Sequence, residues 1–446
     1  MDSYNAIRKI VKIRWRLKLH HSISIIGLGY VGLPLALAFA KRHFKVVGID
    51  LDSDKLAMLR QGTSYLTDVP DCMIEKAITE EELFVTDDYR YIASTSAVIV
   101  CVPTPLAPDG IPDLSCLHQA TARIGRFVTE GMLVVLESST YPGTTREVFM
   151  PMLEQQGFVV GRDVYAAYSP ERIDPGNRQY GLENVPKIVS GLTESCTRRA
   201  AELYAAVFQH IVTVSSTETA EMAKLLENTY RFINISFINE FAILCDAMQI
   251  NVWEVIDAAR TKPYGFSAFY PGPGVGGHCI PVDPLYLQWK LLEHGAGSEF
   301  IRIAEQTNHS MPRYIVSRLQ GLWPESGVTK RRILLAGVAY KQGITDTRES
   351  AALELMTLLR AEGAEVSYYD PFVPSLRMDA EEERSVLLNE HVLHHMDCVV
   401  IATDHAELPL ALILEHAPLV YDTRNATKGL SGKARIIGLG AGDRLE

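Results

Sequence analysis

The stretch "SISIIGLGYVGLPLALAFAKRHFKVVGIDLD", residues 22–52, decides the fold of the first third of this chain. It predicts a buried strand over 22–26, a turn with three glycines, an apolar helix over 33–42 and a second strand over 45–49. The glycines are spaced Gly-x-Gly-x-x-Gly, and an acidic residue, Asp50, follows the second strand. This order predicts the start of an α/β sheet with parallel strands.

The glycine turn has the composition of a dinucleotide-binding site. Gly27 permits a tight turn, Gly29 lets the backbone approach a pyrophosphate, and Gly32 lets the helix pack closely on the strand. The N-terminus of the helix offers unpaired N–H groups to the same anion. Asp50 stands where a carboxylate accepts hydrogen bonds from ribose hydroxyls and would repel a 2′-phosphate. We therefore expect NAD, rather than NADP, as the cofactor.

Length and charge exclude several classes of protein. A chain of 446 residues predicts two or three domains. The formal net charge is −11, and because the first twenty residues contribute +5, the rest carries −16, which argues against a nucleic-acid binder. The basic segment predicts an N-terminal arm, with contact to an anionic membrane surface as the alternative. Seven scattered cysteines predict free thiols and a cytoplasmic protein.

One uncharged run imitates a membrane span. Residues 23–40 carry no charged side chain, which is about the minimum length of a transmembrane helix. The glycine turn and a proline inside the run explain it better, so we expect no membrane insertion.

Further strands are predicted at 97–105 and 133–140, each followed by turn and helix signals. In parallel sheets, ligands bind at the carboxyl ends of the strands. Thr104, Glu137 and Thr140 lie at or near such ends, as does the segment "YSPERIDPGN" at 168–177, which makes all of them candidates for a catalytic face. The alternative for each is an ordinary turn or cap residue.

Residues 217–249 contain no glycine or proline and place apolar side chains at helical spacing, which predicts one unusually long helix. Such a helix would join two α/β domains and supply a dimer interface. Lys224 and Asn228 project from one face of it, one turn apart. From helix geometry alone, an ordinary solvated pair of Lys224 with Glu221 or Glu227 is the favoured interpretation.

The segment "PGPGVGGHCIPVDP", residues 271–284, places Cys279 beside His278 in a stretch that favours neither helix nor strand. A zinc site is disfavoured because no second cysteine or histidine stands nearby at ligand spacing, and we expect no metal site. Glycines before Cys279 admit a ligand to the backbone, and Asp283 follows four residues later. The residues alone leave a nucleophile and a buried inert thiol equally open.

The last third repeats the α/β pattern, with a strand at 333–336, a glycine turn and a helix over 350–362. Lys341 and Arg348 follow that strand in an otherwise acidic chain, so a phosphate is a plausible partner. The fold prediction is α/β, with two Rossmann-like parallel-sheet domains joined by a long central helix. The expected parts are a basic arm (1–21), an NAD-binding domain (22–214), a central helical domain with the cysteine loop (215–325) and a second α/β domain (326–446).

Seven motifs in order, "GLGYVGLP", "VPTP", "SST", "SPER", "AEMAKLLENTYR", "GPGVGGHCIPVDP" and "GVAYKQGITDTRES", resemble the UDP-glucose/GDP-mannose dehydrogenase family. The resemblance spans nearly the whole chain from about residue 22. It implies that the central domain (215–325) dimerises and that the C-terminal domain (326–446) binds UDP. It implies a homodimeric enzyme of polysaccharide biosynthesis that oxidises the C6 alcohol of a UDP-sugar to a carboxylate. Two NAD⁺ and one water are used, and the aldehyde is not released.

The resemblance also implies roles for individual residues. Cys279 matches the nucleophile that forms a thiohemiacetal and then a thioester with C6, and Lys224 matches the lysine that stabilises oxyanions. Asn228 and Asp283 match its companion on the helix and a carboxylate that works with water near the nucleophile. The implied catalytic set also includes Glu171 for thioester hydrolysis and Thr140 for ordering water and cofactor. The implied cofactor contacts are Gly27, Gly29, Tyr30, Val31, Gly32, Asp50, Thr104 and Thr140. The implied substrate contacts are Glu171, Arg172, Lys224, Asn228, Gly276, Lys341 and Arg348.

The sugar is predicted from two of these motifs. "SPERIDPGN" and "GGHCIPVDPLYLQWK" are most similar to the branch that oxidises UDP-N-acetylhexosamines, with UDP-N-acetylglucosamine first, UDP-N-acetylmannosamine second and UDP-glucose third. In this interpretation His278 marks the branch. A hypothesis from a different class is a nucleotide-sugar sensor that binds both ligands without turnover.

Overall fold

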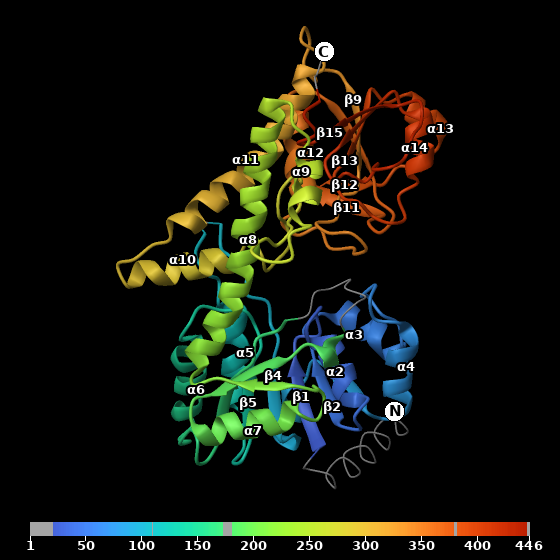
Figure 1. Ribbon diagram of the computed structural model, residues 1–446. Coiled ribbons are helices and arrows are strands. Elements are labelled where there is room, and N and C mark those ends of the chain that lie inside the picture. The colour runs from blue at the N-terminus through green and yellow to red at the C-terminus, as the bar shows by residue number, and fades with distance from the viewer. Residues whose placement is uncertain (1–20, 109, 173–180, 379–380, 444–446) are drawn as a thin grey trace. The chain divides into compact units, whose positions relative to one another are not determined.

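The computed structural model describes residues 21–108, 110–172, 181–378 and 381–443, and the chain divides into two compact units (Figure 1). The first unit runs to Glu227 and adds Trp289–Gly295, and the second contains the rest. Nearly all of the expected basic arm lies outside the described residues. The residues expected to form a separate central domain are distributed over both units.

The first unit contains an eight-stranded sheet in the order β3-β2-β1-β4-β5-β6-β7-β8. Its strands are β1 (Ser22–Ile26), β2 (Lys45–Ile49), β3 (Leu83–Thr86), β4 (Ala97–Val100), β5 (Leu133–Leu136), β6 (Tyr165–Tyr168), β7 (Lys187–Gly191) and β8 (Ile211–Thr213). All neighbours are parallel except β6 and β7. The predicted parallel α/β sheet is therefore confirmed, with one antiparallel pairing that the sequence did not reveal.

Helices cover both faces of this sheet. They are α2 (Gly32–Ala40), α3 (Ser53–Arg60), α4 (Asp71–Thr79), α5 (Ser115–Gly125), α6 (Met150–Gln155) and α7 (Glu194–Tyr204), with short turns η2 (Tyr89–Ser94), η3 (Thr145–Phe149) and η4 (Leu182–Asn184). Successive side chains of a strand point to opposite faces. Ile25 accordingly packs with α2 and α7, whereas Ile26 packs with α5 and α6. This two-sided burial explains why the strands are almost wholly apolar.

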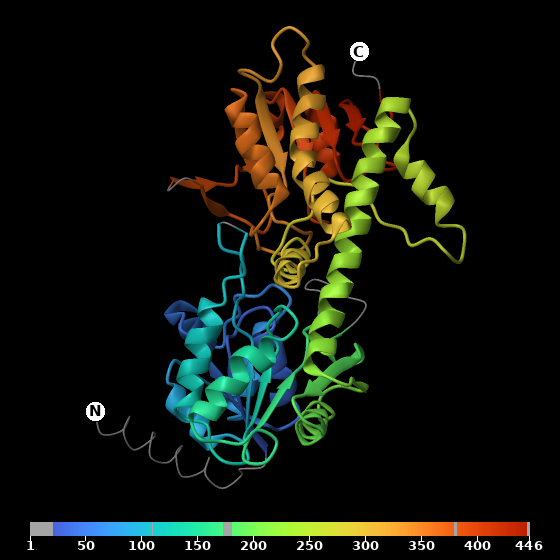
Figure 2. The ribbon, with the colours of Figure 1, turned by 90° about the vertical axis from the view of Figure 1, so that its left-hand side faces the viewer.

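The second unit contains a five-stranded, fully parallel sheet in the order β10-β9-β13-β14-β15. The strands of this sheet are drawn in orange and red in Figure 2. Its strands are β9 (Arg332–Ala336), β10 (Glu365–Tyr369), β13 (Cys398–Ile401), β14 (Leu419–Asp422) and β15 (Arg435–Gly438), and β11 (Ser375–Met378) and β12 (Glu381–Arg384) form a hairpin. The remaining helices are α9 (Val252–Ala259), α10 (Asp283–Glu293), α11 (Glu299–Gly321), α12 (Ala351–Ala361), α13 (Glu390–His394) and α14 (Leu410–His416). Residues of α11 and α12 pack on one face of the sheet, and residues of α13 and α14 on the other.

The long helix expected from the sequence is present as α8 (Thr217–Met248), 32 residues without interruption. It contains the point in the chain at which the first unit ends. Large apolar side chains are exposed along it at intervals of four or seven residues, namely Met222, Leu226, Tyr230, Phe237, Leu244 and Met248. Within the described residues, no helix combines the length and apolarity needed to cross a membrane.

Candidate active site

The glycine turn after β1 has the geometry that its proposed roles require. Gly27 has a φ of +87°, and a Cβ there would lie 2.6 Å from the carbonyl oxygen of Cys101. A Cβ on Gly32 would lie 1.8 Å from the Gly27 oxygen, so the helix can pack here only on a glycine. Around Gly29 there is open space, with no atom within 4 Å of a Cβ. This turn leaves room for a ligand to approach the backbone, as a dinucleotide would.

Asp50 and Thr104 lie at the same edge of the sheet, after β2 and β4. The Asp50 carboxylate accepts hydrogen bonds from the backbone N–H of Leu28, at 2.8 Å, and of Asp52, at 3.0 Å. Thr104 is buried, and its hydroxyl donates to the Ser139 carbonyl at 2.7 Å. Asp50 thus stabilises the glycine turn and is itself only half-buried.

Thr140 carries an unsatisfied buried polar atom. Its side chain is 1 % exposed, and among the described residues its hydroxyl oxygen has no hydrogen-bond partner. Buried hydroxyls normally have a partner, so an orphan indicates a bound water or ligand. Together with the open space at Gly29, this fits the nicotinamide dinucleotide that the glycine turn predicts.

The buried Lys187 holds Glu171. Lys187 was not among the functional residues predicted from the sequence. The Lys187 ammonium lies 2.7 Å from Glu137 and 3.5 Å from Glu171, and its side chain is 3 % exposed. The Tyr204 hydroxyl donates a short hydrogen bond to Glu137. Burial would lower the pKa of Lys187, but the two carboxylates outweigh it and raise that pKa. Burial raises the pKa of Glu137 despite the nearby lysine.

Lys224 is buried and makes no ion pair among the described residues; its exposure is 8 %. The favoured interpretation, a solvated pair with Glu221 or Glu227, is wrong because both carboxylates are used elsewhere. Glu221 accepts from the Gly143 N–H at 2.5 Å and from Thr145 at 2.9 and 2.7 Å.

Glu227 instead binds the Arg172 guanidinium at 2.6 Å. Arg172, an implied substrate contact, is also held by the Pro186 carbonyl at 2.7 Å. Burying a charge without a partner is costly. Lys224 is therefore a cation suited to an anionic ligand or intermediate.

The cysteine loop ends at the N-terminus of α10. Cys279 is half-buried, and its carbonyl accepts from the Asp283 N–H at 2.9 Å. Asp283 is 2 % exposed, and its carboxylate accepts from the Asn228 amide at 2.5 Å. The structure thus brings together a thiol, a buried carboxylate and the amide that orients it. The half-buried position of Cys279 is compatible with either of the two alternatives, a nucleophile or an inert thiol.

The glycines before Cys279 pack against the loop that follows β9. A Cβ on Gly276 would lie 2.4 Å from the Glu349 carbonyl oxygen, and Gly277 donates its N–H to the Arg348 carbonyl at 3.1 Å. Gly276 thus has a packing reason to be glycine, in addition to its implied contact with the sugar. The sequence separated these two segments by some seventy residues, and the fold places them side by side.

Two polar side chains in this region bear on ligand binding. The Arg348 guanidinium pairs with Asp346 at 2.6 Å and remains half exposed. The His278 Nε2 is buried and has no hydrogen-bond partner among the described residues. Burial, with the nearby Arg348 charge, lowers the pKa of His278, so its imidazole is neutral at pH 7. Lys341 is half-buried and lies in the loop after β9, as Arg348 does.

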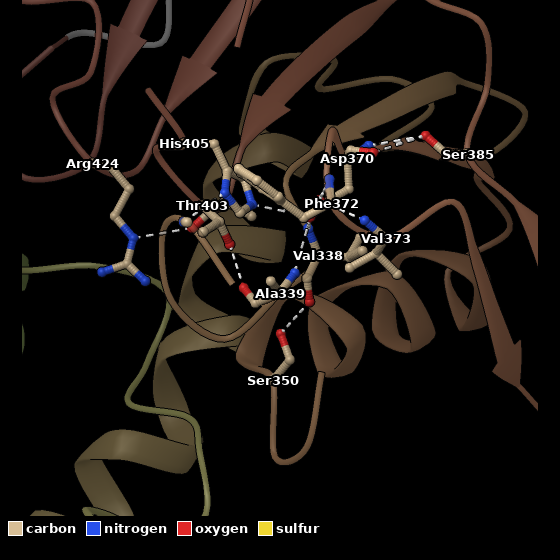
Figure 3. A network of polar contacts seen from close by, with 12 residues as sticks. Val338, Ala339, Ser350, Asp370, Phe372, Val373, Ser385, Thr403, His405 and Arg424 are labelled. Carbon is tan, nitrogen blue, oxygen red and sulfur yellow. Dashed lines mark hydrogen bonds and ion pairs between the residues drawn. The ribbon is translucent and has the colours of Figure 1, made fainter. Parts of the chain in front are cut away.

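The second unit also has an acidic residue after its second strand, Asp370 after β10, but the hydrogen bonds of this residue differ from those of Asp50 (Figure 3). The Asp370 carboxylate accepts from the N–H groups of Val338 at 2.7 Å and Ala339 at 3.1 Å, and from His405 Nε2 at 3.1 Å. Its other oxygen accepts from Phe372 and Val373. Burial would raise the pKa of Asp370, but these donors hold it below its usual value. Asp370 is saturated within the protein, unlike Asp50.

Comparison with known proteins matches this arrangement. Sequence profiles of the UDP-glucose/GDP-mannose dehydrogenase family match as its NAD-binding domain at residues 21–209, central domain at 218–310 and UDP-binding domain at 334–429. A UDP-N-acetyl-D-mannosamine dehydrogenase of Pyrococcus horikoshii is 34% identical over 94% of this chain and 99% of its own. A UDP-N-acetyl-D-glucosamine 6-dehydrogenase of Pseudomonas aeruginosa is 36% identical over 86% of this chain and 90% of its own.

A solved structure described as the UDP-D-ManNAc dehydrogenase of Pyrococcus horikoshii superposes with a TM-score of 0.85, at 33% identity, over 95% of this chain and 100% of that one. The NAD-binding profile covers the glycine turn, and the UDP-binding profile covers the loop with Lys341 and Arg348. The chain therefore belongs to the UDP-glucose/GDP-mannose dehydrogenase family, and it is an NAD-dependent oxidoreductase that acts on a UDP-sugar.

Proposed function

We propose that this enzyme oxidises the C6 hydroxyl of a UDP-N-acetylhexosamine to the uronic acid through a thiohemiacetal and a thioester on Cys279. The observation that carries the proposal is the cysteine loop, where a partly exposed thiol lies four residues before Asp283 and the carboxylate is fixed by Asn228. An enzyme that moved a single hydride would need no nucleophile. NAD, when bound, accepts the hydride from C6.

The proposed roles follow from the surroundings of each side chain. The Cys279 sulfur forms the bond to C6, and the N-terminus of α10 just beyond it favours the thiolate. Asp283, held by Asn228, accepts at its carboxylate, through water, the proton that the C6 hydroxyl gives up when the hydride leaves. Lys224 lacks a protein counter-ion among the described residues, so its ammonium is available to stabilise the oxyanion at C6.

Hydrolysis of the thioester is assigned to a second group of residues. The Glu171 carboxylate, held at 3.5 Å by Lys187, orients the attacking water. The orphan hydroxyl of Thr140 supplies a further hydrogen bond to water or cofactor. In the second unit, Lys341 and Arg348 are assigned to the UDP-binding region, and Gly276 to the sugar.

The first candidate for the sugar is UDP-N-acetylglucosamine, as the motifs around Glu171 and Cys279 suggest. The second is UDP-N-acetylmannosamine, because several relatives at similar identity carry that name. His278 is proposed to contact the sugar of the substrate, since its buried Nε2 lacks a protein partner among the described residues.

The test is to incubate the enzyme with NAD⁺ and each of UDP-N-acetylglucosamine, UDP-N-acetylmannosamine and UDP-glucose. We expect two NADH for each uronic acid formed and the highest kcat/KM with UDP-N-acetylglucosamine. One NADH per sugar, with a released aldehyde or ketone, would overturn the four-electron reaction. Highest kcat/KM with another sugar would overturn only the choice of substrate.

We also propose that the enzyme is a homodimer that pairs through α8. The exposed stripe from Met222 to Met248 supports this, because a monomer rarely exposes a continuous apolar face of that length. In a symmetric dimer, the same stripe on both copies would be buried.

A further inference from the structure

A cluster of metal-binding side chains lies on the second unit, away from the cysteine loop in sequence. It consists of Glu390 and His394 on α13 and His416 at the end of α14. The Glu390 Oε1 lies 3.5 Å from His394 Nε2 and 3.6 Å from His416 Nδ1. All three donor atoms lie within 4.8 Å of one another. None of the roles assigned above uses these residues.

The backbone beneath the cluster is fixed by the core. Leu393, next to His394, is completely buried, as are Ile413 and Leu414 shortly before His416. The Asn389 side chain caps the start of α13 by accepting from the Val392 N–H at 2.9 Å. The core therefore fixes the backbone positions from which the three side chains project.

The spacing of the donor atoms fits a tetrahedral ion. Zinc bonds of about 2.0–2.2 Å to nitrogen and oxygen place neighbouring ligand atoms roughly 3.3 Å apart. The two observed separations from Glu390 exceed that value by only a few tenths of an ångström. Two imidazoles and one carboxylate also form a donor set that suits zinc and similar transition metals, whereas Mg²⁺ and Ca²⁺ prefer oxygen alone.

We propose that Glu390, His394 and His416 bind Zn²⁺ or a similar divalent transition-metal ion, with a fourth position left for water. The ion would join α13 to α14. The nearby cation Lys433 forms its own ion pair with Glu415, so the Glu390 carboxylate remains available to a metal. The proposal does not depend on the reaction or on the sugar.

The test uses the full chain, stripped of metal by a chelator and desalted at pH 7.5. Zinc is titrated in competition with a chromophoric chelator, for wild type, His394→Ala, His416→Ala and His395→Ala. His395 is the matched control, because it stands beside His394 but hydrogen-bonds the His391 carbonyl through Nδ1, at 2.7 Å. All variants retain every cysteine, so zinc held by thiols contributes equally.

We expect wild type and His395→Ala to bind one more zinc per chain than the other two variants. Zinc should also raise the unfolding temperature of wild type and His395→Ala more than that of His416→Ala. Glu390→Gln, a change at an exposed side chain, provides a third variant with weakened binding in case a histidine variant fails to fold. Equal stoichiometry in all variants would overturn the site and leave only direct contacts between Glu390 and the two histidines. Loss of zinc in His395→Ala as well would overturn this set of ligands.

Discussion

Removing the buried ammonium of Lys187 should destabilise the first unit strongly. In Lys187→Met, the carboxylates of Glu137 and Glu171 lose a cation that lies 2.7 and 3.5 Å away. The side chains of Lys187 and Glu137 are 3 % and 0 % exposed, so solvent cannot replace the lost partner. Breaking a buried pair from one side costs about 3–5 kcal/mol. Tyr204 still donates to Glu137 and offsets a small part of this loss.

The assay is calorimetric or denaturant unfolding, with Lys41→Met as the matched control. Lys41 pairs with Glu183 at a similar distance, 2.9 Å, but its side chain is 63 % exposed. An exposed pair contributes at most about 1 kcal/mol. We therefore expect a much larger loss for Lys187→Met, and a double variant with Glu137→Gln should lose less than the two single changes added together.

The same variant tests the link to Glu171. Because Lys187 no longer holds the Glu171 carboxylate, thioester hydrolysis should slow more than hydride transfer. An acyl adduct on Cys279 should therefore accumulate and be visible by intact-protein mass spectrometry. Equal stability losses for Lys187→Met and Lys41→Met would refute the reasoning about the buried pair. Slow turnover without any adduct would refute the link to Glu171.

Four further outcomes are expected. Cys279→Ser should form much less uronic acid than wild type, measured by chromatography, because the thioester cannot form. Lys224→Ala should lower kcat by roughly 100-fold or more while NAD affinity, measured by calorimetry, changes little, since the proposed role of the ammonium is to stabilise a transient oxyanion. Burial raises the pKa of Glu221 to about 7 from 4.5, so its contribution to stability is complete below pH 4.5 and is lost as pH rises through 7. The free energy of unfolding should therefore fall by up to about 3 kcal/mol over this range, and less in Glu221→Gln. Phe237→Glu should shift the sedimentation coefficient from dimer to monomer, because it places a charge in the apolar stripe.

Two of these outcomes have a control variant, and the other two have a result that would contradict them. Lys262→Ala removes an exposed lysine that lies over the Tyr264 ring and should leave kcat unchanged. Leu387→Glu changes an 88 % exposed leucine outside α8 and should leave the dimer intact. A normal uronic acid yield from Cys279→Ser would contradict the nucleophile. An unchanged pH slope in Glu221→Gln would contradict the buried-carboxylate origin of the slope.

The local parts of the fold were predictable from the sequence. The strand, turn and helix around Gly27 follow from spacing within thirty residues, and α8 follows from a long uninterrupted helical pattern. The antiparallel position of β7 was not predictable, because no short-range signal states which way a strand enters a sheet.

The site was predictable only in part. The sequence singled out Cys279, Asp283 and Lys224, but it gave Lys224 a solvated pair that the structure removes. The partners that occupy Glu221 and Glu227 come from segments more than fifty residues away, and helix spacing carries no information about them. Lys187 went unnoticed for the same reason, since its partner Glu137 is fifty residues distant.

The saturated carboxylate of Asp370 has a consequence for inhibitor design. Both units present a glycine turn after their first strand, yet only the turn with Asp50 keeps an acid with capacity for a ribose. A dinucleotide analogue should therefore titrate to one equivalent per chain, and analogues of UDP should compete elsewhere. Analogues of the dinucleotide can then be optimised against the Asp50 turn alone, because the corresponding acid of the second unit has no free capacity for a ribose.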